Sequence, residues 1–231
     1  MTSPDRPVDA VFFDLFGTLV SLGPLDVACD EVAPGRGPEL AARWRARQLE
    51  ISWLRTAMDR WADFDTVTRD ALGAALDELG ITGHDDRDLP VLADAFAELP
   101  LAAGAIEVID RLQAAGLATG ILTNASTKTL GRVAARLDLG FDQLLSVDAA
   151  RGYKPDPSVY RLAVDATGLA PERIGFVTAN GWDAAGAGAV GFSVAWLRPN
   201  PAARLPAVGA PDPVIATWAD VAAVFGATAR A

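Results

Sequence analysis

Short apolar runs alternate with amphipathic stretches along most of the chain. The apolar runs lie at residues 8–14, 117–123, 144–147, 174–178 and 193–197, and the amphipathic stretches lie at 105–115, 127–137, 157–167 and 183–190. Runs of this length predict buried strands, whereas apolar positions that recur every three or four residues predict helices. Because strands that alternate with helices are joined by right-handed crossovers, the pattern predicts an α/β fold with a Rossmann-like, mostly parallel sheet.

The alternation is interrupted once, between the first and the second predicted strand. Residues 26–100 contain several helical patterns and no convincing strand, in a place where one crossover helix would suffice. We therefore expect an inserted helical cap subdomain at residues 23–100. The α/β core domain is then formed by residues 1–22 and 101–231.

The longest helix of the insertion is expected to begin at Pro38, since proline is favoured in the first turn, and to run toward Trp61. At helical spacing, one apolar stripe is formed by Leu40, Trp44, Ile51, Leu54, Met58 and Trp61. Arg45, Leu49 and Trp53 lie together on the opposite side. We expect the stripe to pack inside the subdomain and the second face to meet another surface.

The composition of the chain indicates which cellular compartment and which binding partners to expect. The chain of 231 residues is long enough for a core domain that carries a smaller one, and its formal net charge is -10. This charge argues against nucleic acid and anionic membranes as partners, because both are polyanions. A single cysteine, Cys29, allows no intrachain disulfide, and no apolar run reaches the length of a membrane span. We therefore expect a soluble cytoplasmic protein in which Cys29 is buried.

Polar residues follow the predicted strands directly, at the edge where a parallel sheet binds its ligands. These residues are Asp14, Thr123, Asn124, Lys154 in the next loop, and the segment 178–183. Each of them alone has an ordinary explanation as a turn, a helix cap or a solvated loop residue. Lys154 is one of only two lysines among 20 basic residues, which makes its position more informative.

Taken together, these residues resemble the four motifs of the haloacid dehalogenase superfamily. The segment FFDLFGTLV (12–20) resembles its first motif, with Asp14 as the nucleophile and with Thr18. The second, third and fourth motifs are matched by LTN (122–124), by Lys154 with the proline after it, and by Asp183. The order of the motifs and the helical insertion also match, so the resemblance covers essentially the whole chain.

The chain departs from the magnesium-dependent phosphatases of that superfamily at two positions. Those enzymes generally carry a general-acid aspartate two residues after the nucleophile and paired acidic residues in the fourth motif, where this chain has Phe16 and Ala179. Magnesium prefers several hard oxygen ligands, and an alkoxide leaving group needs a proton that Phe16 cannot give. A halide leaves without a proton. We therefore expect no metal ion and no other cofactor.

The (S)-2-haloacid dehalogenase branch of the superfamily matches better. The segment 34–55 resembles the cap helix of that branch, which places the halide-binding arginine at Arg45, and FVTANGWDA (176–184) resembles its fourth motif. The resemblance implies a small 2-halocarboxylic acid as substrate and a two-step reaction. Asp14 displaces the halide from C2 with inversion, and water then hydrolyses the Asp14 ester to release a 2-hydroxy acid.

The resemblance also assigns the remaining site residues. Lys154 would keep Asp14 ionised, and Thr123 with backbone N–H groups near Asn124 would hold the substrate carboxylate. The halide would be received by Arg45 and Asn180, water would be excluded by Phe16, Leu49, Phe64 and Trp182, and the hydrolytic water would be oriented by Asp183 with Thr178 and Tyr160.

Several alternatives stay open at this stage. The branch usually has serine at Thr123 and Thr178, tyrosine at Phe16 and glutamine at Ala46, which leaves the preferred halide and chain length open. Without the resemblance, Arg45 is interpreted as a solvated helix residue, and core packing explains Trp182 equally well. A magnesium-dependent phosphatase and an inert binding protein with the same fold are the other candidate functions, and a homodimer through the insertion is implied only by the resemblance. His84, the only histidine, is expected in a surface loop without a function.

Overall fold

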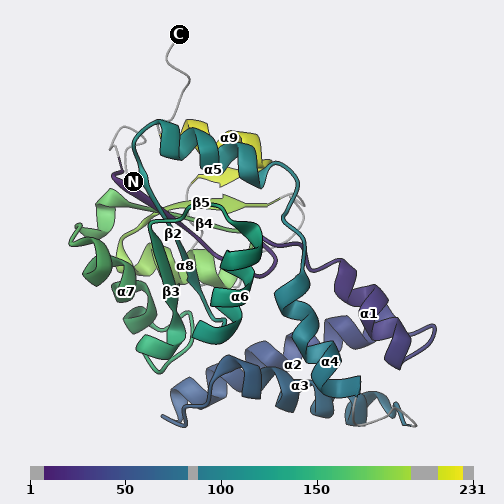
Figure 1. Cartoon of the computed structure of the whole chain (residues 1–231). Coiled ribbons are helices and arrows are strands. Elements are labelled where there is room, and N and C mark those ends of the chain that lie inside the picture. The colour runs from purple at the N-terminus through teal and green to yellow at the C-terminus, as the bar shows by residue number, and fades with distance from the viewer. Residues whose placement is uncertain (1–7, 83–87, 199–212, 226–231) are drawn as a thin grey trace.

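The computed structural model describes residues 8–82, 88–198 and 213–225, and Figure 1 shows how they are arranged. Within these ranges the strands are β1 (Ala10–Phe13), β2 (Ala118–Thr123), β3 (Gln143–Ser146), β4 (Ile174–Thr178), β5 (Ser193–Leu197) and β6 (Val214–Ile215). They form one sheet in the order β3-β2-β1-β4-β5-β6, in which every neighbouring pair is parallel. The predicted parallel α/β fold is therefore confirmed.

The first strand lies in the middle of the sheet, where its apolar residues are covered on both faces. All residues of β1 are buried, and β1 pairs with β2 on one side and with β4 on the other. The chain builds the sheet from β1 outward through β2 and β3, and then returns to the other side of β1 at β4. Sheets with such a reversal bind ligands beyond the carboxyl ends of the strands at which the order reverses, here β1 and β4.

Helices cover both faces of the sheet. In the described part of the core they are α5 (Ala105–Ala114), α6 (Thr127–Leu137), α7 (Pro157–Thr167), α8 (Gly181–Val190) and α9 (Trp218–Val224), with the short 3-10 helices η2 (Val147–Ala149) and η3 (Pro171–Arg173). α5 packs against α9, and α7 packs against α8 on the opposite face (Figure 1). β6 and α9 have no counterpart in the sequence prediction. The strand β6 has only 2 residues, too few for a recognisable apolar run, and the helix α9 has only 7.

The segment between β1 and α5 is helical. It consists of α1 (Pro24–Val32), α2 (Gly37–Ala57), α3 (Phe64–Leu79), α4 (Asp88–Asp94) and the 3-10 helix η1 (Ala95–Glu98), and we call it the helical insertion. In Figure 1 it lies at the lower right of the sheet, with α2 and α3 packed along each other. The two chain segments that join it to the core run side by side, since Ser21 N donates to Pro100 O (2.9 Å) and Ala102 N donates to Leu19 O (2.8 Å).

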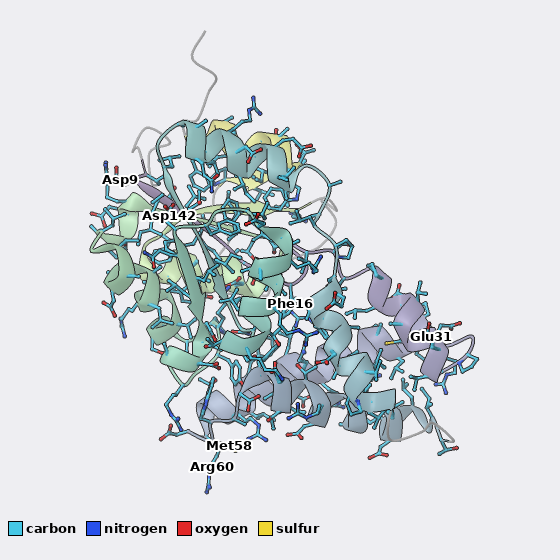
Figure 2. The ribbon with its side chains drawn as sticks, in the orientation of Figure 1. Asp9, Phe16, Glu31, Met58, Arg60 and Asp142 are labelled. Atoms are coloured by element: carbon cyan, nitrogen blue, oxygen red, sulfur yellow. The ribbon has the colours of Figure 1, made fainter. Side chains whose placement is uncertain are left out.

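The helical insertion adjoins the carboxyl edge of the sheet. Figure 2 shows Phe16, which follows β1, at the junction between the sheet and the insertion, whereas Asp9 and Asp142, which precede β1 and β3, lie far from it. The ring of Phe16 packs against Phe64 of α3 (centroids 6.4 Å apart) and Phe96 of η1 (5.1 Å). The residues that follow the strands are therefore enclosed between the core and the insertion.

The longest helix, α2, differs from its prediction in its end and in its buried side. It ends at Ala57, short of the predicted end, and Leu54 and Met58 are 50% and 58% exposed. The buried side is formed by Gly37, Leu40, Ala41, Trp44, Gln48 and Ser52. The prediction that Leu54 and Met58 pack inside the subdomain is wrong, because the buried side continues through Gln48 and Ser52, whose polar atoms find hydrogen-bond partners there.

The single cysteine, Cys29 of α1, is buried, as expected from the sequence. None of the described helices is both long and apolar enough to cross a membrane. His84 lies outside the described residues, so the expected surface loop stays a prediction.

Candidate active site

Asp14 lies at the carboxyl end of β1, directly beside the end of β4. Its backbone N–H donates to Val177 O (3.0 Å), which continues the pairing of the two strands. A tight turn follows, in which Gly17 adopts a φ of 81°, a value that glycine takes without strain. The turn brings Thr18 back over the strand end, so that its Oγ1 donates to Oδ2 of Asp14 (3.0 Å).

The two oxygens of the Asp14 carboxylate have different surroundings. Oδ2 accepts from Asn180 Nδ2 (2.7 Å) and from Thr178 Oγ1 (3.5 Å), in addition to the hydroxyl of Thr18. Among the described residues, Oδ1 accepts only from Lys154 Nζ (3.1 Å). Oδ1 therefore keeps a lone pair that can attack a substrate, while Oδ2 is held by several donors.

Lys154 is fully buried between two carboxylates. Its Nζ lies 3.1 Å from Asp14 Oδ1, 3.0 Å from Asp183 Oδ2 and 4.7 Å from the centroid of the Phe176 ring. Its backbone N–H donates to Asn124 Oδ1 (3.0 Å), which ties the loop after β3 to the end of β2. A buried cation requires such partners, because an uncompensated charge in the interior is strongly destabilising.

Asp183, in the first turn of α8, is fully buried beside Lys154 and Tyr160. Tyr160 Oη donates to Asp183 Oδ1 (2.7 Å). Burial raises the pKa of Asp183 to about 6, although the positive charge of Lys154 offsets part of the rise. Burial, with the negative charge of Asp183, also raises the pKa of Tyr160 well above its usual value, so its hydroxyl stays a hydrogen-bond donor.

The residues after β2 lead directly into α6. Thr123 Oγ1 accepts from the backbone N–H two residues further on (3.0 Å), and Ser126 caps α6 by accepting from Thr129 N (3.0 Å). Asp65 of α3 accepts from Ser126 Oγ and Thr129 Oγ1, both at 2.9 Å, and so joins the helical insertion to the start of α6. Thr123 and Asn124 thus lie in a buried turn at a helix start, an environment that favours an anion.

The second face of α2 meets the core, as predicted. Trp53 Nε1 donates to the backbone oxygen of Lys154 (3.0 Å), and Leu49 and Arg45 lie one and two turns earlier on the same side. At Arg45, the loss of water lowers the pKa of the guanidinium, while the negative charges of both site carboxylates raise it. Arg45 therefore lies within electrostatic reach of the site.

The aromatic residues predicted to exclude water lie in two places. Phe16 and Phe64 form part of the wall of a cavity of about 220 Å³ between the helical insertion and α6, which is also lined by Lys128. Trp182 packs edge-on against Trp53 (centroids 5.8 Å apart) and lines a separate, shallow groove of about 410 Å³.

One hydrogen-bonded cluster contains Asp14, Thr18, Lys154, Tyr160, Thr178, Asn180 and Asp183. Thr123 and Asn124 adjoin this cluster, and Arg45 of the helical insertion interacts electrostatically with its two carboxylates. Sequence reasoning missed Gln48, whose Oε1 accepts from Arg45 Nη1 (2.5 Å), and it missed Asp65. Gln48 follows Arg45 by three residues, a spacing that brings two side chains together on a helix, so this contact could have been predicted. The contacts of Asp65 depend on how the helical insertion packs against α6.

A family model of haloacid dehalogenase-like hydrolases matches residues 8–191 of the chain. The chain belongs to this family. As a haloacid dehalogenase-like hydrolase, it is 41% identical over 193 residues to the (S)-2-haloacid dehalogenase of Pseudomonas sp. (strain YL), with 83% of each chain covered. It is 38% identical over 195 residues to the (S)-2-haloacid dehalogenase of Pseudomonas putida, with 84% of this chain and 86% of the relative covered.

A solved structure is similar to this chain over nearly its whole length. The L-2-haloacid dehalogenase of Xanthobacter autotrophicus with covalently bound chloropropionic acid superimposes with a TM-score of 0.88 at 33% identity. The match covers 95% of this chain and 98% of that one. The similarity therefore extends over both the sheet and the helical insertion of this haloacid dehalogenase-like hydrolase.

The residues around Asp14 do not fit a magnesium ion. The described residues contain no group of three His, Cys, Asp or Glu side chains that could hold a metal, and Phe16 and Ala179 supply no carboxylate. The oxygens of Asp14 face hydrogen-bond donors, which are Lys154 Nζ, Asn180 Nδ2 and the hydroxyls of Thr18 and Thr178, rather than further carboxylate ligands. A metal at this carboxylate would have to displace these donors.

Proposed function

We propose that this hydrolase converts small (S)-2-haloalkanoic acids into (R)-2-hydroxy acids and halide, through an ester of Asp14 and without a metal ion. The observation that carries the proposal is the Asp14 carboxylate, whose Oδ1 accepts only from the buried Lys154 among the described residues and whose negative charge acts on Arg45. An arginine suits a departing halide, which takes an electron pair and needs no proton. The names of the relatives and the covalently bound chloropropionic acid in the Xanthobacter autotrophicus structure support this reaction.

In the first step, Oδ1 of Asp14 attacks C2 of the substrate. The new O–C2 bond forms on the side opposite the halogen, so the C2 configuration inverts and the halide leaves with the electrons of the broken bond. Lys154 stabilises the attacking carboxylate from the interior side. Both N–H groups of Asn180 have acceptors, Asp14 Oδ2 (2.7 Å) and Phe16 O (3.2 Å), so we assign the halide to Arg45 and assign Asn180 to holding Oδ2.

In the second step, water attacks Cγ of the Asp14 ester. Oδ2 becomes the oxyanion of the tetrahedral intermediate, and Thr18 and Asn180 already donate to it. Asp183 accepts one proton of the water and returns it to the departing C2 alkoxide, whose oxygen is the former Oδ1. The second water proton is lost to solvent, and Asp14 is regenerated as a carboxylate. Tyr160 and Lys154 hold Asp183 in place for this role.

The substrate carboxylate lies at the start of α6 beside Thr123 and Asn124, where the N–H groups of residues 125 and 127 already donate to Thr123 Oγ1 and Asp148 Oδ2. The walls that exclude water are Phe16 and Phe64, with Leu49 from α2. Trp182 closes the side of the site toward Trp53. Excluding bulk water strengthens the electrostatic contacts of the halide.

The proposal also includes the organisation of the protein. Residues 23–100 act as a cap domain over a core of residues 1–22 and 101–231, and the protein is cytoplasmic. Two copies associate through the outer face of α2, where Leu54 and Met58 are exposed near the shallow groove that Trp53 lines. Multi-angle light scattering tests the homodimer, because Leu54→Glu with Met58→Glu is expected to reduce the measured mass by half. A wild-type chain that elutes as a monomer would contradict it.

A simple incubation tests the reaction. The purified protein with EDTA and racemic 2-chloropropanoate is expected to consume one enantiomer, to release an equal amount of chloride and to form (R)-lactate. Racemic lactate, or no chloride, would refute the proposal. Turnover of p-nitrophenyl phosphate that requires added magnesium would instead support a phosphatase.

A further inference from the structure

A fully buried amide side chain contacts the arginine of the site. Gln48 of α2 accepts from Arg45 Nη1 through Oε1 (2.5 Å) and donates to Thr68 Oγ1 of α3 through Nε2 (2.7 Å). Thr68 is itself buried, and its backbone oxygen accepts from Trp44 Nε1 (2.8 Å). Because a guanidinium only donates, the oxygen of the amide has to face Arg45. The contacts with α3 therefore fix the direction in which this acceptor points.

The partner of Arg45 is neutral, whereas the arginines next to it on α2 are paired with carboxylates. Arg43 lies 3.6 Å from Glu78, and Arg47 forms ion pairs with Glu50 and Glu78. In the part of the chain that the structure describes, Arg45 forms no ion pair with a carboxylate side chain. A neutral acceptor orients the guanidinium but leaves its positive charge available to an anion.

Packing alone does not explain an amide at this position. The neighbouring buried side chains of α2 are largely apolar, among them Leu40 and Trp44, and burying an amide costs free energy unless its hydrogen bonds are made. Gln48 lies one turn from Arg45, so a leucine or methionine would fill the same volume without that cost. The amide at position 48 is therefore explained by its hydrogen bonds with Arg45 and Thr68.

We propose that Gln48 is a positioning residue, which holds the guanidinium of Arg45 toward Asp14 and preserves its full charge for the halide. This inference rests on the proposed function, in which Arg45 receives the departing halide. The halide affinity of the site then depends on two residues, the charged Arg45 and the neutral Gln48. Gln48 is held in place by its hydrogen bond to Thr68 of α3. A carboxylate at position 48 would orient Arg45 equally well but would neutralise it.

The test is bromide binding, measured by calorimetric titration of the full-length protein with sodium bromide. We expect Gln48→Glu to weaken bromide binding about tenfold or more, because the new carboxylate pairs with Arg45. Gln48→Met, which removes the acceptor at similar volume, is expected to weaken it less. Ala114→Glu adds the same charge at an exposed position of α5, on a different helix from Arg45, and is the matched control, with an affinity within about twofold of the wild type.

A double-mutant cycle separates positioning from a general effect on the fold. In an Arg45→Ala background, Gln48→Glu is expected to cause no further loss of bromide affinity, because Gln48 acts through Arg45. If the Gln48 variants do not fold, Thr68→Val removes the anchor of the amide and is expected to weaken bromide binding several-fold. Wild-type bromide affinity in Gln48→Glu or Thr68→Val, or no bromide binding by the wild type, would overturn the inference.

Turnover distinguishes this inference from the proposed function. Gln48→Glu is expected to reduce kcat/KM for 2-chloropropanoate and to raise the inhibition constant of product halide by a similar factor. A wild-type protein that turns over 2-chloropropanoate while Gln48→Glu leaves halide inhibition unchanged overturns only the role of Gln48. A wild-type protein that does not release chloride, but binds bromide in a Gln48-dependent way, overturns only the proposed function.

Discussion

The ammonium group of Lys154 lies 3.1 Å from Oδ1 of Asp14, at a position where the lysine side chain has no exposed surface. The same ammonium lies 3.0 Å from Asp183, so one buried cation compensates two carboxylates. In the interior, charges that lose their partner are far more destabilising than at the surface. The stability of the core and the reactivity of Asp14 therefore depend on the same side chain.

Replacing Lys154 is expected to damage the fold as well as the reaction. Lys154→Met leaves Asp14 and Asp183 close together without a cation, and removing one partner of a buried ion pair typically costs roughly 3–5 kcal/mol. We expect the free energy of unfolding to fall by about that amount and chloride release to cease. Urea denaturation checks the first and a chloride assay the second. Lys128→Met, at the exposed lysine, is the control for the urea midpoint alone, because Lys128 also lines the cavity beside Phe16. An unchanged midpoint for Lys154→Met would contradict the prediction.

The oxygen that leaves with the product identifies the nucleophile. In a single turnover in water enriched in oxygen-18, the label is expected in the Asp14 carboxylate and not in the lactate, because the product oxygen comes from Oδ1. Mass spectrometry of the peptide that contains Asp14 measures the label. Asp14→Asn is expected to abolish chloride release and labelling, while its melting temperature shows whether the fold is kept. Label found directly in the lactate would show that water attacks C2.

The pH dependence of ester hydrolysis should follow Asp183. Its pKa is raised to about 6, mainly by burial, and it accepts a proton only when ionised. As the pH falls below 6 the protonated fraction grows, so the rate of the second step is expected to fall about tenfold per pH unit. Stopped-flow measurement of the ester lifetime between pH 4.5 and 8 tests this. An acid limb that persists in Asp183→Asn, or a constant rate down to pH 4.5, would exclude Asp183 as the base.

Strand ends were the most predictable part of the molecule. Parallel strands present their carboxyl ends at one edge, so the apolar runs alone indicated that Asp14, Thr123 and Thr178 lie near one another. The role suggested for Arg45 needed more than periodicity, because its side chain reaches the site only through the packing of the helical insertion on the core. Helical spacing did place Arg45 and Trp53 on the face that meets the core.

Which side chains of α2 are buried is harder to predict from the sequence, for a physical reason. A hydrophobic pattern treats an amide as an exposed residue, yet Gln48 is fully buried because Arg45 and Thr68 satisfy its polar atoms. Leu54 and Met58 fit an apolar stripe but remain exposed. Hydrogen-bond partners supplied by another helix cannot be deduced from the period of α2 alone.

Gly186 of α8 controls how closely Tyr160 approaches Asp183. A methyl group at Gly186 would clash with Tyr160 Oη and with Pro155, whereas at Gly188, two residues further along α8, it would meet nothing within 4 Å. We expect Gly186→Ala to destabilise the fold by roughly 1–3 kcal/mol and to slow ester hydrolysis, because Tyr160 is pushed from Asp183. Gly188→Ala is the matched control and is expected to stabilise the helix by up to about 1 kcal/mol.

A second substitution shows whether the effect of Gly186→Ala passes through the tyrosine hydroxyl. Tyr160→Phe removes the atom nearest to the added methyl, so the double variant is expected to lose less stability than the sum of the two single variants. Its ester hydrolysis should be no slower than that of Tyr160→Phe alone, because the same hydrogen bond to Asp183 is already missing. Thermal unfolding and the ester lifetime measure the two quantities. Additive losses in both would mean that the methyl acts through Pro155 and the packing of α8, and not through the contact between Tyr160 and Asp183.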